Sequence, residues 1–448
     1  MLLSSMIRNP FSAAPWGWGR LTLTALALMV LAPAASIAAD PAGQFEKPPV
    51  LQAKDLVPAT LLSGEGFHVD DAVPTDGLMA LFTLHTELGT LQVHGIELLR
   101  IRVAEVPAML ELSHESKTKV FAQALARTGA EPIKAAGQMV MHPVDTVKGL
   151  PGGVGRFFGR VGLGAQRIKE AATEPEEASA GEKAGEVAKR TGQTTRDILG
   201  YEQERRELAH RLHVDPYTTN PILSKQLDEF AVVAFRAHVA VTTTISVVVP
   251  GSMAITATRI TSNMVWDTPK ADLIVRNQKT LEELQVPPAT IKAFMRNMAF
   301  PLSVQTALVE DLNDLSKVSG VVDAVTLAST AQSEDQARFI ADCLDLLSRY
   351  SKTHTPVARI IARGTIVGRD STGAIVVPAA VDYASWTSRT SYFANRPDLA
   401  APKRSVWLTG RMSPLARKNF LALGWQVNEK TALLPAGSAL GGTAPSHP

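Results

Sequence analysis

Apolar and polar residues alternate over two short runs near the start of the chain, Leu78–Thr83 and Thr90–Gly95. Alternation with a period of two residues is typical of half-buried β-strands, and His85–Gly89 supplies a turn, so the pattern predicts a β-hairpin. From Ile96 the apolar residues recur every three or four positions instead. This change of period predicts that a helix follows the hairpin, with a kink near Pro107.

The helical period dominates residues 194–352. Within this block, Asp215–Pro221 contains two prolines that fix the backbone, and either Thr219 or Asn220 can cap the helix that follows. The run Phe230–Val249 is strongly apolar but contains an arginine and a histidine. Both side chains would be costly in a bilayer, so the pattern favours a core helix over a membrane span.

The pattern changes again in residues 353–434, where short apolar runs alternate with turns. Ala358–Val367 and Ala374–Val377 flank the turn-forming stretch Gly368–Gly373, which predicts two strands joined by a hairpin-like turn. Further on, Ser405–Thr409 is a predicted strand.

A helix start signal follows that strand. Ser413 is a suitable N-cap and Pro414 a suitable first helical residue, so we predict a helix that ends at Gly424. Trp425–Val427 is then a further predicted strand. Such a strand–turn–helix–strand unit can present backbone N–H groups to an anion.

Over about twenty residues this unit resembles the second half of a rhodanese-type sulfurtransferase domain. The resemblance rests on the strand VWLTG, on Ser413 and Ala416, and on the helix end Ala422–Trp425. In that family a cysteine at the end of the strand carries the sulfur. Here Leu408 and Thr409 occupy the corresponding region, so the resemblance implies a structural unit without sulfur-transfer chemistry.

The fold class that these patterns predict is α+β and predominantly helical, with an N-terminal β-hairpin with helices, a central helical block and a small C-terminal β/α module. The predicted segments are a signal peptide (1–39), a loosely ordered lead-in (40–75), a hairpin-plus-helices module (76–170), a flexible acidic linker (171–193), a helical domain (194–352), the β/α module (353–434) and a disordered tail (435–448).

The first residues have the pattern of a secretory signal peptide. Arg8 and Arg20 precede the uncharged run Leu21–Ala32, and small residues follow. The run is shorter than the roughly 20 residues that cross a bilayer, which favours cleavage after Ala38 or Ala39 over an uncleaved anchor. We therefore expect a periplasmic or secreted protein, with no integral membrane span after cleavage.

The charge balance bears on possible partners, and the cysteine content bears on disulfide bonds. The chain has 45 Lys and Arg against 43 Asp and Glu. Loss of Arg8 and Arg20 would leave a near-neutral protein, which argues against nucleic acid as a partner. Cys343 is the only cysteine, so the chain forms no internal disulfide, and its helical spacing predicts a buried thiol.

The stretch Val147–Lys169 contains five basic residues, seven glycines and no acidic residue. If it is helical, an arginine face adjoins an aromatic and aliphatic face, which is the pattern of a helix that lies on an anionic membrane. The alternative is a glycine-rich connector that packs on its own domain, because glycine disfavours helix. The residues predicted to contact a membrane or a protein partner are Arg156, Phe157, Phe158, Arg160 and Arg167.

Two groups of histidines are candidate metal ligands. Glu207, His210 and His213 are spaced three residues apart on a predicted helix, but the arginines around them would repel a cation, which favours an ion-paired, solvated helix. His85 and His94 could converge on the hairpin, although a strand histidine is more often an ordinary polar residue. We expect no metal and no cofactor.

Two function hypotheses remain. The favoured one is a non-catalytic periplasmic protein that associates with the envelope or with a protein partner through the basic stretch. The alternative is a periplasmic enzyme, such as a hydrolase, with dispersed catalytic residues between the helical and C-terminal blocks. Its first candidates are His354, Asp370, Asp382 and Tyr383. The residue patterns leave open whether the chain is an enzyme.

Overall fold

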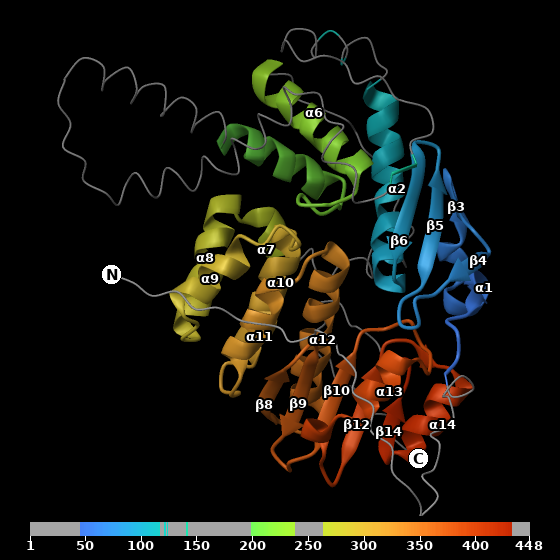
Figure 1. Ribbon diagram of the computed structural model, residues 1–448. Coiled ribbons are helices and arrows are strands. Elements are labelled where there is room, and N and C mark those ends of the chain that lie inside the picture. The colour runs from blue at the N-terminus through green and yellow to red at the C-terminus, as the bar shows by residue number, and fades with distance from the viewer. Residues whose placement is uncertain are drawn as a thin grey trace, which may run out of the picture. The chain divides into compact units, whose positions relative to one another are not determined.

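The computed structural model describes residues 45–116, 121, 123, 140–141, 199–237 and 263–431. The predicted signal peptide, the stretch Val147–Lys169 with its contact residues, the acidic linker and the tail lie outside the described residues, and the domain boundaries stay predictions. In the described part, the predicted α+β, helix-rich class is confirmed, with hairpin, helical block and β/α module in the expected order (Figure 1).

The predicted hairpin is confirmed and belongs to a larger sheet. The sheet has the order β2-β3-β5-β6-β7, with β2 at Ser63–Gly64, β3 at Phe67–Val69, β5 at Leu81–Thr86, β6 at Gly89–His94 and β7 at Val140–Met141. Phe82, Leu84 and Val93 are buried on one face of the hairpin. This face packs with Leu99 and Val103 of the helix α2, Ile96–Ser116, which continues through Pro107. The alternating pattern therefore placed the correct side chains in the core.

The prediction of a loosely ordered lead-in is wrong for residues 50–74. They form β1 (Val50–Gln52), α1 (Ala53–Leu56), the 3₁₀ helix η1 (Ala59–Leu61), β2, β3 and β4 (Ala72–Pro74), and β1 pairs antiparallel with β4. Leu61, Val69 and Val73 are buried in the same core as the hairpin. Their burial stabilises a segment whose prolines and glycines had suggested disorder.

The central block is helical, as predicted. Its helices span residues 199–211, α6 (Pro221–Ala237), α7 (Asn263–Asp267), α8 (Lys270–Glu283), α9 (Pro288–Met295), α10 (Leu302–Asp314), α11 (Val321–Ser329) and α12 (Glu334–Thr353). Asn220 caps α6, because its Oδ1 accepts hydrogen bonds from the backbone N–H groups of Ile222 and Leu223 at 3.1 and 3.3 Å. Among the described residues, no helix combines the length and apolar composition that crossing a bilayer requires.

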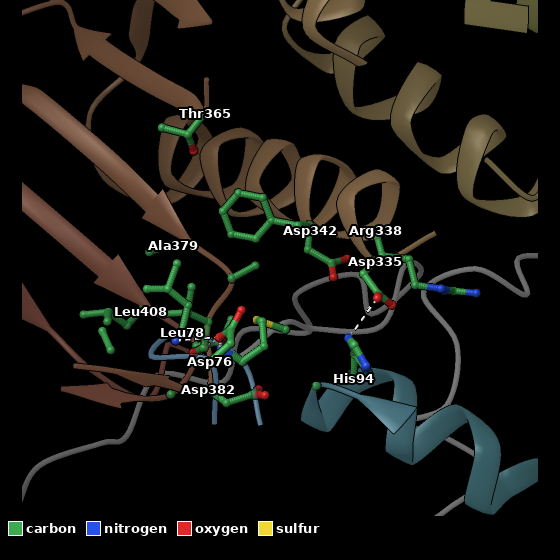
Figure 2. Close-up of a pocket in the computed structure, with 18 of the residues that line it drawn as sticks. Asp76, Leu78, His94, Asp335, Arg338, Asp342, Thr365, Ala379, Asp382 and Leu408 are labelled. Atoms are coloured by element: carbon green, nitrogen blue, oxygen red, sulfur yellow. Dashed lines mark hydrogen bonds and ion pairs between the residues drawn. The ribbon is translucent and has the colours of Figure 1, made fainter. Parts of the chain in front are cut away.

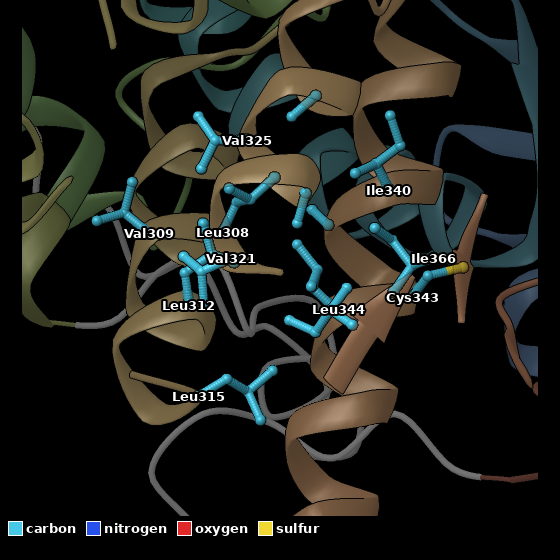
Figure 3. Close-up of a cluster of buried hydrophobic side chains, with 14 of the residues drawn as sticks. Leu308, Val309, Leu312, Leu315, Val321, Val325, Ile340, Cys343, Leu344 and Ile366 are labelled. Carbon is cyan, nitrogen blue, oxygen red and sulfur yellow. The ribbon is translucent and has the colours of Figure 1, made fainter. Parts of the chain in front are cut away.

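The core of this block lies between α10, α11 and α12 (Figure 3). Leu308, Leu312, Val325 and Leu344 are fully buried there. Cys343 lies in the same cluster, as its helical spacing predicted, and burial raises the pKa of its thiol to about 12. The thiol is therefore protonated and inert at neutral pH.

A buried polar network connects α2 to α12 and to the turn before α6. Arg102 Nη1 lies 3.0 Å from Glu105 Oε2, and Arg102 Nη2 donates to the hydroxyl of Thr219 at 2.6 Å. The same Nη2 lies 3.8 Å from Oε1 of Glu334, the first residue of α12. Glu105 also accepts hydrogen bonds from the hydroxyl of Thr218 and, at 2.9 Å, from the side-chain amide of Asn220. Because every charge in the network has a partner, two elements that are distant in sequence are held at fixed positions.

The C-terminal module is a mixed sheet of order β14-β12-β10-β9-β8. Its strands are β8 (Val357–Ala362), β9 (Ile366–Asp370), β10 (Ile375–Ala379), β12 (Arg404–Leu408) and β14 (Trp425–Asn428); β10, β12 and β14 are parallel. The predicted strand Ala358–Val367 is wrong, because Arg363–Thr365 forms a turn that divides it into two paired strands.

Helices cover both faces of this sheet. Val376 packs with the core of α12, whereas Ile375 and Val377 pack with residues of α13 (Ser388–Ala394) and α14 (Pro414–Ala422). The predicted start of α14 is confirmed, since the hydroxyl of Ser413 accepts a hydrogen bond from the N–H of Ala416 at 2.9 Å. Because helices cover the two faces of the sheet, a ligand site can form at the ends of its parallel strands.

Candidate functional site

A cavity of about 1490 Å³ lies at the carboxyl ends of the parallel strands β10 and β12. Ala379 and Leu408, the last residues of these strands, form part of its wall, and α12 and the start of α2 form other parts (Figure 2). Ligands in open α/β sheets bind in this position, beyond the carboxyl ends of the strands. The cavity is therefore the candidate functional site.

Asp382 lies in this cavity wall and connects the N-terminal and C-terminal modules. Its Oδ2 accepts a hydrogen bond from the N–H of Ala80 at 2.9 Å, and its Oδ1 accepts one from the N–H of Ile96 at 3.2 Å. Ile96 is the first residue of α2, so the carboxylate also lies at the positive end of the helix dipole. Gly410 is needed beside it, because a Cβ on Gly410 would lie 1.9 Å from the carbonyl oxygen of Asp382.

Burial raises the pKa of Asp382 to about 6. The backbone N–H groups of Ala80 and Ile96 lower this pKa, whereas the negative charges of Asp76 and Asp342 raise it further. Asp76 and Asp342 line the same cavity. The negative charges of Asp76 and Asp342 thus disfavour the ionised form of the buried Asp382.

An ion pair between α12 and the hairpin borders these carboxyl groups. Nδ1 of His94, the last residue of β6, lies 2.9 Å from Oδ2 of Asp335 in the first turn of α12 (Figure 2). The hydrogen bond with Asp335 raises the pKa of His94. Near it, Arg338 pairs with Glu334 at 2.6 Å.

Exposed cationic side chains also line the cavity. Arg363 follows β8, Arg389 lies in α13, and Lys430 follows β14; all three are exposed. The lining therefore combines a central group of carboxylates with exposed positive charges. This distribution suits a ligand that carries both a positive and a negative group.

The residues named for the enzyme hypothesis fall into two pairs. Asp370 accepts a hydrogen bond from the hydroxyl of Tyr350 at 3.1 Å and holds the turn after β9. His354 stacks on the same Tyr350, with ring centroids 5.3 Å apart. Asp382 lines the cavity, and Tyr383 is the half-buried first residue of β11, Tyr383–Ala384. Of these four residues, Asp382 alone lines the cavity.

The histidines named as candidate metal ligands lie apart or pack on aromatic rings. The strand register places His85 opposite Thr90 and His94 opposite Leu81, so these two histidines lie at different ends of the hairpin and do not converge. His210 stacks on Trp266 at 4.9 Å, and His213 meets the same ring edge-on. Both histidines therefore have a packing role against this tryptophan.

Four residues of α12 that line the cavity share one helix face: Asp335, Arg338, Phe339 and Asp342. They lie three, four and seven positions apart, which is the spacing of neighbours along a helix. This stripe of three charged residues and one phenylalanine was visible in the sequence, but nothing in the sequence connected it to Asp76 or Asp382. Sequence reasoning therefore named Asp382 and His94 separately and missed the rest of the site.

Comparisons with protein-family models, with curated proteins and with solved structures gave no match to this chain. The site therefore has to be interpreted from its own geometry.

Proposed function

We propose that this chain is an exported, non-catalytic binding protein whose cavity holds a small zwitterionic ligand with a positively charged nitrogen. The observation that carries the proposal is the group of carboxyls, Asp76, Asp342 and Asp382, around one cavity. A bound ammonium or guanidinium group would offset the repulsion that Asp76 and Asp342 exert on the buried carboxylate of Asp382. The exposed Arg363 and Arg389 offer partners for the negative group of the ligand.

The proposal predicts ligand-dependent stabilisation of the chain. A thermal-shift screen would use amino acids and betaines as probes, with carboxylic acids of the same size that lack the nitrogen for comparison. A zwitterion that binds should raise the melting temperature, because a ligand at 100 times its Kd stabilises the folded state by about 2.7 kcal/mol. The acids without the nitrogen should give no shift.

Asp342→Asn is the informative variant, because it removes one cavity charge and keeps the side-chain shape. We expect it to abolish the thermal shift. Asp323→Asn is the matched control, since Asp323 is an exposed residue of α11 outside the cavity lining. The proposal fails if no zwitterion shifts the melting temperature, or if Asp342→Asn responds as strongly as the control.

We propose further that Val147–Lys169 contacts an anionic membrane surface. The support is its sequence, in which Arg156, Arg160 and Arg167 adjoin Phe157 and Phe158 without any acidic residue. Each basic residue near an anionic surface contributes about 1 kcal/mol of binding, so removing three should weaken binding at least about 100-fold.

Co-sedimentation with anionic liposomes tests this contact. The unaltered chain should bind in a salt-sensitive manner, and the Arg156/Arg160/Arg167→Glu variant should stay in the supernatant. Neutral liposomes are the control for contact by apolar residues alone. Absence of binding by the unaltered chain would exclude the membrane contact and leave the cavity proposal intact.

A further inference from the structure

Two neighbouring strands of the N-terminal sheet place three metal-ligand side chains together. His68 of β3 lies directly opposite His85 of β5 in the antiparallel register. Asp70 is two residues beyond His68, and residues two apart on an extended chain point to the same face. One ligand atom from each of these side chains lies within 4.8 Å of the other two. The three side chains thus form a single cluster, which we call the His–Asp–His cluster.

The face of the cluster is turned away from the core. The intervening Val69 and the preceding Leu84 are buried, whereas His68 and Asp70 are exposed and His85 is half-buried. The cluster lies outside the lining of the cavity. A metal ion can therefore reach it from solvent, and its occupancy is separate from ligand binding in the cavity.

The orientation of His85 is fixed in the manner of a metal ligand. Its Nδ1 lies 3.1 Å from the hydroxyl of Thr90, and its Nε2 lies 3.1 Å from Oδ1 of Asp70. A histidine that binds a metal through one ring nitrogen usually has a hydrogen-bond partner on the other. Here Thr90 is that partner, which leaves Nε2 directed at the space shared with Asp70.

The side-chain types of the cluster suit a transition-metal ion. The rings of His68 and His85 are stacked, with centroids 4.6 Å apart and an angle of 14° between their planes, so the two imidazoles lie side by side. Two imidazoles and one carboxylate form a donor set that suits Zn²⁺ and its neighbours in the first transition series.

We propose that the His–Asp–His cluster binds one divalent transition-metal ion, with Zn²⁺ as the reference case. Two imidazole nitrogens and one carboxylate oxygen would hold the ion, and water would complete its coordination. Ligands at about 2.1 Å from a tetrahedral ion lie roughly 3.4 Å apart, so small rotations of the exposed His68 and Asp70 close the site. With three protein ligands the ion keeps an open position.

Titration of the untagged, chelator-treated chain with Zn²⁺ by isothermal titration calorimetry tests the proposal. We expect one equivalent to bind, and His85→Gln to weaken the affinity at least about 100-fold, because it removes a ligand. Thr90→Val should weaken it by about 10-fold, since it removes only the hydrogen-bond partner. Co²⁺ should give visible absorption bands in the unaltered chain and lose them in His85→Gln.

His94→Gln is the matched control, because His94 is also paired with an aspartate but lies at the opposite end of the hairpin. Its Zn²⁺ affinity should equal that of the unaltered chain. Circular dichroism without metal would establish that each variant is folded. Absence of stoichiometric Zn²⁺ binding, or equal affinity in folded His85→Gln and His94→Gln, would overturn the proposal.

Discussion

Replacing Arg102 with methionine is expected to lower the free energy of unfolding by about 3–5 kcal/mol. The side chains of Arg102 and Glu105 are only 7% and 4% exposed. Methionine fills similar space but leaves the Glu105 carboxylate buried without its cationic partner. The hydrogen bonds from Thr218 and Asn220 remain, but they cannot replace the charge. Urea denaturation at neutral pH measures the loss.

The control for this experiment is another ion pair within a helix. Lys279 and Glu283 of α8 lie 3.7 Å apart, but their side chains are 74% and 64% exposed. Lys279→Met should change the stability by less than about 1 kcal/mol, because solvent screens an exposed pair. If both variants cost the same, the network around Arg102 is not the structural link that its burial indicates.

Stability should fall as the pH rises from about 4 to about 6, and Asp382 should account for much of that fall. An aspartate in the unfolded chain has a pKa of about 3.9, whereas burial raises the pKa of Asp382 in the folded chain to about 6. Between these values the folded state binds more protons than the unfolded state. The contribution of Asp382 is therefore fully present below the unfolded pKa and is lost as the pH rises through the folded pKa.

The shift of about two pKa units corresponds to about 3 kcal/mol. Urea denaturation across this pH range would compare the unaltered chain with Asp382→Asn, whose side chain has a similar shape but does not titrate. The difference between the two curves isolates Asp382 from other groups. Curves that stay parallel from pH 4 to about 7 would contradict the prediction.

The same titration bears on the proposed ligand. A positively charged nitrogen in the cavity favours the ionised form of Asp382, so ligand affinity should increase as the pH rises through about 6. The ionised carboxylate of Asp382 would then favour ligand binding but make the ligand-free protein less stable. This is a common property of charged binding sites.

Local rules accounted for much of the fold. The alternation in β5 and β6, a cap at Thr219 or Asn220 and the Ser413–Pro414 helix start were each visible in a few adjacent residues, and the structure shows that Asn220 is the cap. Local rules failed where a few buried apolar residues outweighed the local composition, as in residues 50–74, where Val73 is fully buried in the core of the hairpin.

What the sequence by itself determined is the order of elements, the side chains that face the core and the burial of Cys343, because these follow from the period of apolar residues. Only the tertiary structure decided the sites. The hydrogen bond from the N–H of Ala80 to Asp382 joins residues 302 positions apart. The register of β3 and β5 places His68 opposite His85. Periodicity reports which face of an element is buried, but not which other element covers it. Both sites arise where particular elements pack against each other, and only the tertiary structure decides which elements those are.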